Sequence, residues 1–214
     1  MTPPGPLLTK EGELYAEHTV ETSPPPYQGG GWGVVDTAMK LLFLFALLAL
    51  APVAPKKWVA DKTKSTVTYA MKHPMHDWQG VSRDVSAALV MDDATRQVQQ
   101  VAVVIRVASF DSKNQNRDSH MVEVLDGLKY PNVTFSSQDV RANPDGSLTA
   151  NGKLTFHNVT KPISIQATRR EANGQLILDG KFDVKLTDYN VERPSLLAVP
   201  VEDQFNMSFS LVFR

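Results

Sequence analysis

Two short stretches of the chain combine residue types that can do chemistry. The first contains two histidines and two methionines, at Met71, His73, Met75 and His76. Mixed imidazole and thioether ligands suit copper. Alternation along a strand places only Met71 and His73 inside, however, and two ligands rarely make a metal site. The sequence therefore favours His73 as a buried polar anchor, hydrogen-bonded in the core or facing a ligand headgroup, and no metal is expected.

The second stretch is polar and follows Asp111. Arg117, Asp118 and His120 could form an acid–base set with it. No serine nucleophile stands in an elbow motif and no metal triad is visible. Aspartate at a helix start is more often a cap. We therefore expect a salt-bridged helix start and no enzyme.

Composition excludes several classes of protein. The chain has 214 residues, of which 42% are hydrophobic and 21% charged, enough for one ordinary domain with an appendage. It has no cysteine, which excludes disulfides, thiolate metal sites and cysteine nucleophiles. A net charge of −1 offers no basic face for nucleic acid.

The composition of the first 55 residues does not indicate that they are part of a folded domain. Residues 1–38 are rich in proline and glycine, which indicates disorder or an over-extended gene start. Residues 39–55 contain Lys40, ten apolar residues from Leu41 to Leu50, and then small residues and prolines. This order is typical of a signal peptide or a membrane-associated segment, and the run is too short for a stable transmembrane span. We expect export.

From Trp58 onward, apolar and polar residues alternate with the period of a β-strand. Turn signals such as Asn173-Gly174 separate about eight such runs, which predicts sequential antiparallel strands. Eight strands can close into a barrel whose interior is either filled or holds one small ligand. Small residues at inward positions leave room for a ligand: Ala87, Ala150, Gly152, Ala167 and Gly180.

One segment breaks this period. Asn116 to Leu128 carries apolar residues at helical spacing, with Asn116 or Asp118 as a cap and Gly127 near the end. The pattern predicts a short helix between the third and fourth long strands, as a lid on the barrel.

Several stretches resemble one family of proteins. They are Trp58 to Asp61 with Ser65 to His73, Ser109 to Asp111 with Asn116 to His120, Lys129 to Phe135, and Gly152 to Pro162. Together they are similar to the YceI-like family over roughly residues 57–214. The resemblance implies an extended lipocalin-like antiparallel barrel at 56–214, located in the bacterial periplasm or secreted. It also implies a polyisoprenoid or another long amphipathic chain bound in an apolar tunnel.

The chain departs from the family pattern in three places. Met121 stands where a leucine is usual, Asn158 replaces a glycine, and residues 192–200 form a longer and more apolar stretch than expected. These departures concern the ligand more than the fold.

The expected function is therefore that of a lipid-binding carrier without a cofactor, whose ligand is isoprenoid-like or fatty-acid-like. A ligand-free structural barrel and a hydrolase are the alternatives, and a homodimer stays open. We expect His73, Arg117, Asp118 and His120 to select the headgroup. The expected tunnel lining consists of Val67, Tyr69, Met71, Val85, Leu89, Val103, Ile105, Phe135, Leu154, Phe156, Ile165, Leu178, Phe182, Phe205, Met207 and Phe209.

Overall fold

The computed structural model describes residues 55–196 and 198–214. The expectations for residues 1–38 and for the apolar run at 41–50 fall outside this part of the chain. Within the described residues, no helix is both long enough and apolar enough to cross a membrane.

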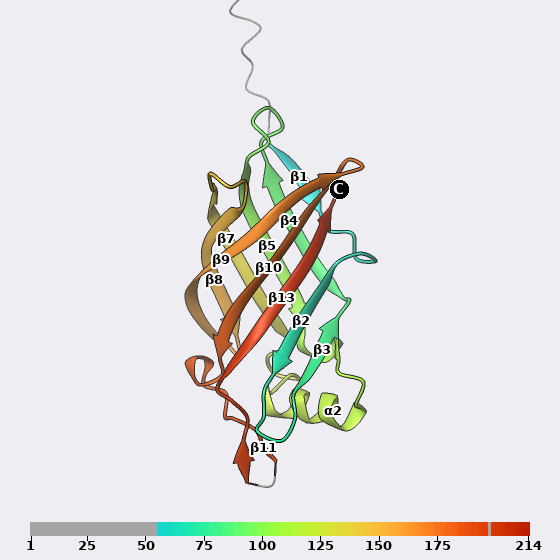
Figure 1. The fold of residues 1–214 in the computed structure, drawn as a ribbon, viewed down its shortest axis with the longest axis vertical. Helices are drawn as coiled ribbons and strands as arrows, with labels where there is room; N and C mark the ends of the chain where they lie inside the picture. Colours follow the sequence, from blue (N-terminus) through green and yellow to red (C-terminus); the bar gives the residue numbers. More distant parts are fainter. Residues whose placement is uncertain (1–54, 197) are drawn as a thin grey trace, which may run out of the picture. The chain divides into compact units, whose positions relative to one another are not determined.

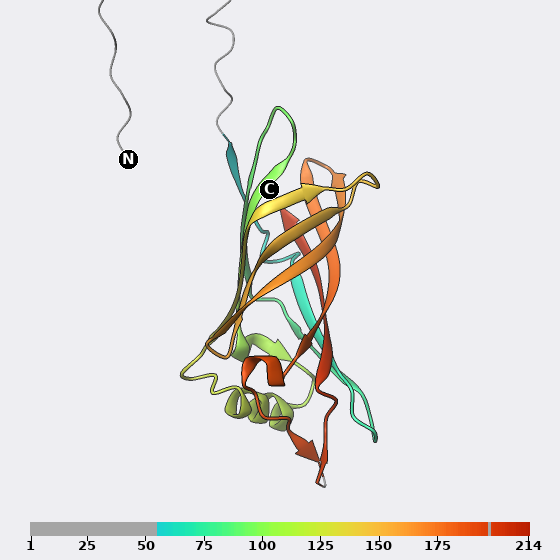
Figure 2. The same cartoon turned by 90° about the vertical axis from the view of Figure 1, so that its left-hand side faces the viewer.

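Antiparallel strands make up most of the described chain (Figures 1 and 2). One sheet has the order β1-β4-β5-β7-β8-β9-β10-β13-β2-β3-β6, and β11 and β12 form a separate hairpin. The strands of the sheet are β1 (Lys56–Val59), β2 (Thr66–Met71), β3 (Trp78–Ser82), β4 (Val85–Met91), β5 (Val98–Arg106), β6 (Phe110–Asp111), β7 (Asn132–Ala142), β8 (Leu148–Phe156), β9 (Val159–Ala172), β10 (Gln175–Lys185) and β13 (Gln204–Phe213). The hairpin consists of β11 (Ser195–Leu196) and β12 (Val199–Pro200), and short 3₁₀ turns stand at Val107–Ser109 and Thr187–Tyr189.

The alternation read from the sequence reappears as burial. Strand β4, for example, buries every second residue from Val85 to Met91. Asn173 and Gly174 join β9 to β10 with φ angles of 51° and 72°. Positive φ at both central residues is the requirement of a tight hairpin turn whose twist matches that of the strands. The predicted all-β antiparallel class is confirmed, and the short β1, β3 and β6 account for the larger number of strands.

The sheet curls, and its two edges meet other strands. At one end, Val59 and Arg214 exchange two backbone hydrogen bonds of 3.1 Å, which joins β1 to the end of β13. At the other end, the chain of β5 continues through a 3₁₀ turn into β6, and β6 pairs with β3. The edge strand β1 thereby has a partner on its outer side, and β6 covers part of β3, which leaves less open edge for other chains.

The contact of β1 with the end of β13 and the pairing of β3 with β6 are called here the two seams of the barrel. Buried polar side chains form hydrogen bonds at both. Ser65 is 1% exposed, and its hydroxyl accepts a hydrogen bond from Val212 N–H at 3.1 Å. Ser82 is 0% exposed, and its hydroxyl lies 2.7 Å from that of Ser109, which in turn donates to the Arg106 carbonyl. Several polar residues of the family-like stretches therefore close the barrel.

Helix α2 (Gln115–Val124) follows β6 and precedes β7 in the chain, and it lies at one end of the barrel (Figure 1). Its place is the predicted one, but its bounds and its cap differ. The side chain of Asn114, rather than Asn116 or Asp118, caps the start by accepting from Arg117 N–H at 3.1 Å. The helix ends earlier than predicted because Asp126, at φ 45°, leaves the helical conformation.

Candidate functional site

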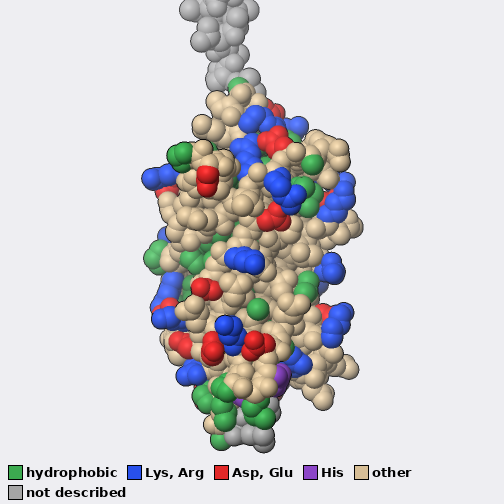
Figure 3. Space-filling model, viewed as in Figure 1, with side chains coloured by type: hydrophobic (Ala, Val, Ile, Leu, Met, Phe, Trp, Pro, Cys, Tyr) green, Lys and Arg blue, Asp and Glu red, His purple; other side chains and the backbone are tan. Residues whose placement is uncertain are grey.

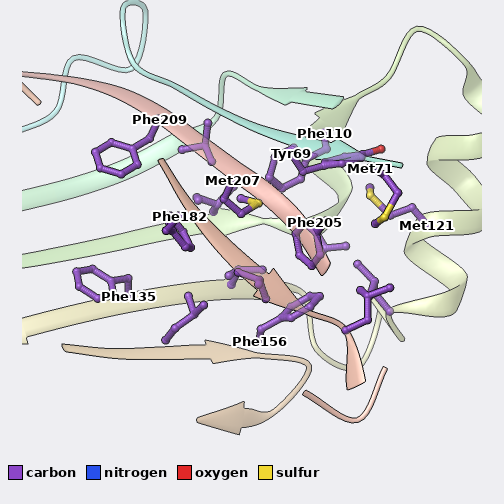
Figure 4. Close-up of a pocket in the computed structure, with 18 of the residues that line it drawn as sticks. Tyr69, Met71, Phe110, Met121, Phe135, Phe156, Phe182, Phe205, Met207 and Phe209 are labelled. Atoms are coloured by element: carbon purple, nitrogen blue, oxygen red, sulfur yellow. The ribbon is translucent and has the colours of Figure 1, made fainter. Parts of the chain in front are cut away.

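A cavity of about 510 Å³ lies inside the barrel. Its wall is contributed by the inner faces of the strands and by α2, and Figure 4 shows aromatic and methionine side chains of different strands pointing toward one another. Fourteen of the predicted tunnel residues line it: Val67, Tyr69, Met71, Val103, Ile105, Phe135, Leu154, Phe156, Ile165, Leu178, Phe182, Phe205, Met207 and Phe209.

Val85 and Leu89 are not among the lining residues, which corrects the prediction for β4. They are 0% and 1% exposed and belong to the packed core, where Leu89 is the cross-strand partner of the buried Trp58. Ala87, between them on the same face, does not border the cavity either. Alternation tells which face of a strand points inward, but it does not tell which part of the interior is already filled.

Some lining residues were missed from the sequence. Met121 and Val124 of α2, and Leu125 directly after it, border the cavity. Their helical spacing is visible in the sequence and could have found them. Val191 and Val201 reach the cavity from the segment between β10 and β13, and no periodic pattern marks them.

The space beside the inward glycines Gly152 and Gly180 is occupied by aromatic rings and is not empty. A Cβ at Gly180 would stand 2.4 Å from Phe209 Cζ, and one at Gly152 would stand 2.8 Å from the Phe135 ring. Both rings therefore lie against the backbone of the neighbouring strand, where only glycine leaves room.

His73 lies at the α2 end of the cavity and is 4% exposed. Its Nδ1 accepts a hydrogen bond from Met75 N–H at 3.1 Å, so in the neutral ring the proton is on Nε2. Nε2 lies 3.1 Å from the Val199 carbonyl oxygen and donates to it. Both ring nitrogens are therefore used by backbone groups, and none is left for a metal or a headgroup.

Arg117 and His120 of α2 also border the cavity. The Arg117 guanidinium lies over the Trp78 ring, with 5.2 Å between Cζ and the ring centroid, which is a cation–π arrangement. The His76 ring is 5.3 Å from the same indole. His120 has a side chain that is 59% exposed, and its Nδ1 lies 3.5 Å from a carboxylate oxygen of Glu123. This end of the cavity is therefore the polar mouth of an otherwise apolar interior.

Asp118 does not border the cavity, so the structure separates it from Arg117 and His120. Its carboxylate accepts from Ser112 N–H at 3.1 and 3.2 Å. Asp111 is bound to Lys113, whose ammonium lies 2.6 Å away, and hydrogen bonds from Lys113 lower the pKa of the Asp111 carboxyl. The four polar residues thus engage separate partners and do not converge on one reacting atom.

Tyr69 carries a buried hydroxyl with no hydrogen-bond partner among the described residues. Its ring packs edge-on against Phe110, with 5.4 Å between centroids. Burial raises the pKa of the phenol, and the charge of Asp118 raises it further. The ring therefore stays neutral and belongs to the apolar wall.

No cluster of three or more histidine, aspartate or glutamate side chains with the geometry of a metal site occurs in residues 55–196 and 198–214. Met71 borders the cavity, whereas Met75 is 60% exposed, so the histidine–methionine stretch does not gather its ligands on one point.

Comparison with known proteins agrees with this geometry. A UPF0312 protein of Pseudomonas putida is 29% identical over 136 residues, which are 58% of this chain and 71% of the relative. The crystal structure of BcnA from Burkholderia cenocepacia matches with a TM-score of 0.65 and 24% identity, over 72% of this chain and 98% of BcnA. A polyisoprenoid binding domain from Saccharophagus degradans matches with a TM-score of 0.60 and 15% identity, over 73% of this chain and 97% of that domain.

At these identities the two solved structures show a shared fold. The family model described as the YceI-like domain matches residues 58–213, which is most of the described chain. Its range starts at the buried Trp58 and ends at the buried Phe213. The chain belongs to the YceI-like family.

Proposed function

We propose that this protein is an exported lipid-binding protein that holds a polyisoprenoid, or another long amphipathic chain, in the cavity of its barrel. The observation that carries the proposal is the cavity itself, about 510 Å³ in volume, with aliphatic and aromatic walls and polar groups at one end. Ligand sites are mostly apolar cavities of this size with a few polar groups that fix orientation. The chemistry fits a long apolar tail inside and a headgroup at the mouth.

Two further observations support the choice of ligand and location. The Saccharophagus degradans protein of the same fold is described as a polyisoprenoid binding domain. Residues 39–55 have the order of a signal peptide, which supports a periplasmic or secreted location in a bacterium. We propose binding rather than catalysis because Asp111, Arg117, Asp118 and His120 engage separate partners.

Native mass spectrometry combined with organic extraction tests this function. The purified full chain is expected to carry a lipid mass that is released by solvent. Ala150→Trp places an indole in the cavity wall and is expected to abolish this mass. Ala102→Trp, on the exposed side of β5, is the matched control and is expected to retain it. A wild-type chain that takes up no lipid from bacterial extract would contradict the proposal and favour a ligand-free structural barrel.

A further inference from the structure

Two hairpins at the mouth end of the barrel present apolar residues to solvent. The loop between β2 and β3 exposes Pro74 and Met75, and the β11–β12 hairpin exposes Ala198, Val199 and Pro200. Met75 is 60% exposed and Val199 is 37% exposed. We call these five residues the mouth tip. Exposed apolar residues that gather at one place mark interaction sites more often than single ones do.

Hydrogen bonds hold the two segments of the mouth tip together. The buried His73 ring accepts from the backbone of Met75 and donates to the backbone of Val199, each at 3.1 Å. A second link joins the same two segments, because Glu202 N–H donates to the Lys72 carbonyl at 3.0 Å. Two stretches far apart in the sequence are thus held side by side, with their apolar side chains outward.

The mouth tip borders the opening of the cavity. Both segments that carry it also contribute to the cavity wall, through His73 and His76 on one side and Pro194 and Ser195 on the other. In Figures 1 and 2, the β2–β3 and β11–β12 hairpins extend from the barrel at the end where α2 lies. Figure 3 shows hydrophobic side chains together with a histidine at this end.

The charged side chains near the mouth tip carry both signs, with an acidic excess. Lys72, Asp77, Glu192 and Glu202 are exposed there. Arg193 adds a second positive charge, and its Nε donates to the Val201 carbonyl at 2.9 Å. A partner recognised by strong opposite charge, such as nucleic acid or a polyanionic surface, does not fit this balance. The exposed apolar residues of the mouth tip are instead suited to contact with an apolar phase.

We propose that the mouth tip inserts into the surface of a lipid bilayer, so that an apolar chain passes between bilayer and cavity without crossing water. The choice of a bilayer as the partner rests on the proposed lipid-binding function. It also rests on the size of the surface, since the five described residues of the mouth tip are too few for a stable protein interface of roughly 1,000 Å². Shallow insertion of a few apolar side chains into the headgroup boundary needs no such area.

The absence of cysteine from the chain allows a site-specific test. Met75→Cys in the full chain is labelled with a polarity-sensitive bimane and mixed with zwitterionic phosphatidylcholine vesicles. Val104→Cys is the matched control, since Val104 is a 38% exposed apolar residue on the barrel wall. The bimane at position 75 is expected to shift to the blue and to be quenched by brominated lipids, and the one at position 104 to change little. The shift is expected to persist in high salt and to fall several-fold on adding Val199→Asp.

An unchanged emission at position 75 overturns the proposal, even where vesicles bind the chain through another segment. Equal shifts at both positions also overturn it, because they show adsorption through the whole wall. A shift that disappears in high salt overturns it too. The lipid extraction described above is independent of this test. A chain that carries lipid without insertion at position 75 keeps its function and loses only the docking surface, whereas insertion without bound lipid does the reverse.

Discussion

The ring of Tyr69 lies directly over the backbone of Gly80, its cross-strand partner on β3. A Cβ at Gly80 would stand 2.4 Å from Tyr69 Cε1 and 2.9 Å from the hydroxyl oxygen. The ring can take this position because glycine has no side chain to oppose it. Tyr69 in turn forms part of the cavity wall, so a small residue on β3 sets the shape of the cavity.

Gly80→Ala is therefore expected to lower the free energy of unfolding by about 1–3 kcal/mol, as overpacking in a core does. Urea denaturation followed by tryptophan fluorescence measures the loss. Tyr69→Leu removes the ring, and Gly80→Ala is expected to cost much less in that background. Additive losses in the double variant would show that the Tyr69 ring is not what opposes the added methyl group.

His73→Ala is expected to reduce stability without changing which headgroup is bound. The substitution removes the hydrogen bonds of the His73 ring to the backbone of Met75 and of Val199, and each such bond contributes about 0.5–1.5 kcal/mol to stability. Thermal denaturation and a competition assay between lipids measure the two effects. Lys72→Ala is the control, because that side chain is exposed and does not border the cavity. A stable variant with altered headgroup preference would restore a ligand-binding role for His73.

Arg117→Ala is expected to change the preference among quinone, alcohol and amide headgroups, with a smaller effect on a plain alkyl chain. The guanidinium lies at the polar mouth over Trp78, where a headgroup retains hydrogen-bonding partners. Competition binding measures the preference. Asp118→Asn is the control, since Asp118 supports the loop at Ser112 outside the cavity. An equal loss of affinity for every ligand, plain chains included, would show that Arg117 only supports the mouth.

Acid is expected to weaken the seam of the barrel next to Asp61. Hydrogen bonds from Thr63 and the charge of Arg214 lower the pKa of the Asp61 carboxyl below its ordinary value of 3.8. The stabilisation is therefore complete above the unfolded-state value and is lost as pH falls through the lower folded-state value. Asp61→Asn is expected to be less stable than wild type at neutral pH, and the difference is expected to shrink below pH 3.8. A difference that stays constant with pH would contradict this role.

Much of the fold could be predicted from the sequence because it depends on local pattern. The alternation along β4 and the Asn173-Gly174 turn are local, and both appear in the structure. The short strands β1, β3 and β6 carry little pattern of their own and are defined by pairing with distant segments. Asn114 caps the helix, rather than Asn116 or Asp118. The reason is that α2 starts at Gln115, one residue before the start that the apolar spacing indicates.

The site could be predicted less completely, because its properties depend on tertiary contacts. Inward alternation placed Phe182 and Met207 along the cavity, but it could not show that the interior around Val85 and Leu89 is filled. The two backbone partners of His73 lie in different hairpins, and one of them is 126 positions away in sequence. No spacing rule identifies such a contact.

The dependence of affinity on chain length tests the central claim most directly. A series of ligands with one headgroup and increasing alkyl length is titrated into the delipidated full chain by isothermal calorimetry. Each buried CH₂ contributes about 0.8 kcal/mol, so affinity is expected to rise roughly fourfold per methylene and then to level off when the cavity is full. In Ala150→Trp the plateau is expected at a shorter chain, and in Ala102→Trp at the wild-type length. An affinity that does not depend on chain length, or a plateau that Ala150→Trp leaves in place, would contradict a lipid chain inside the barrel.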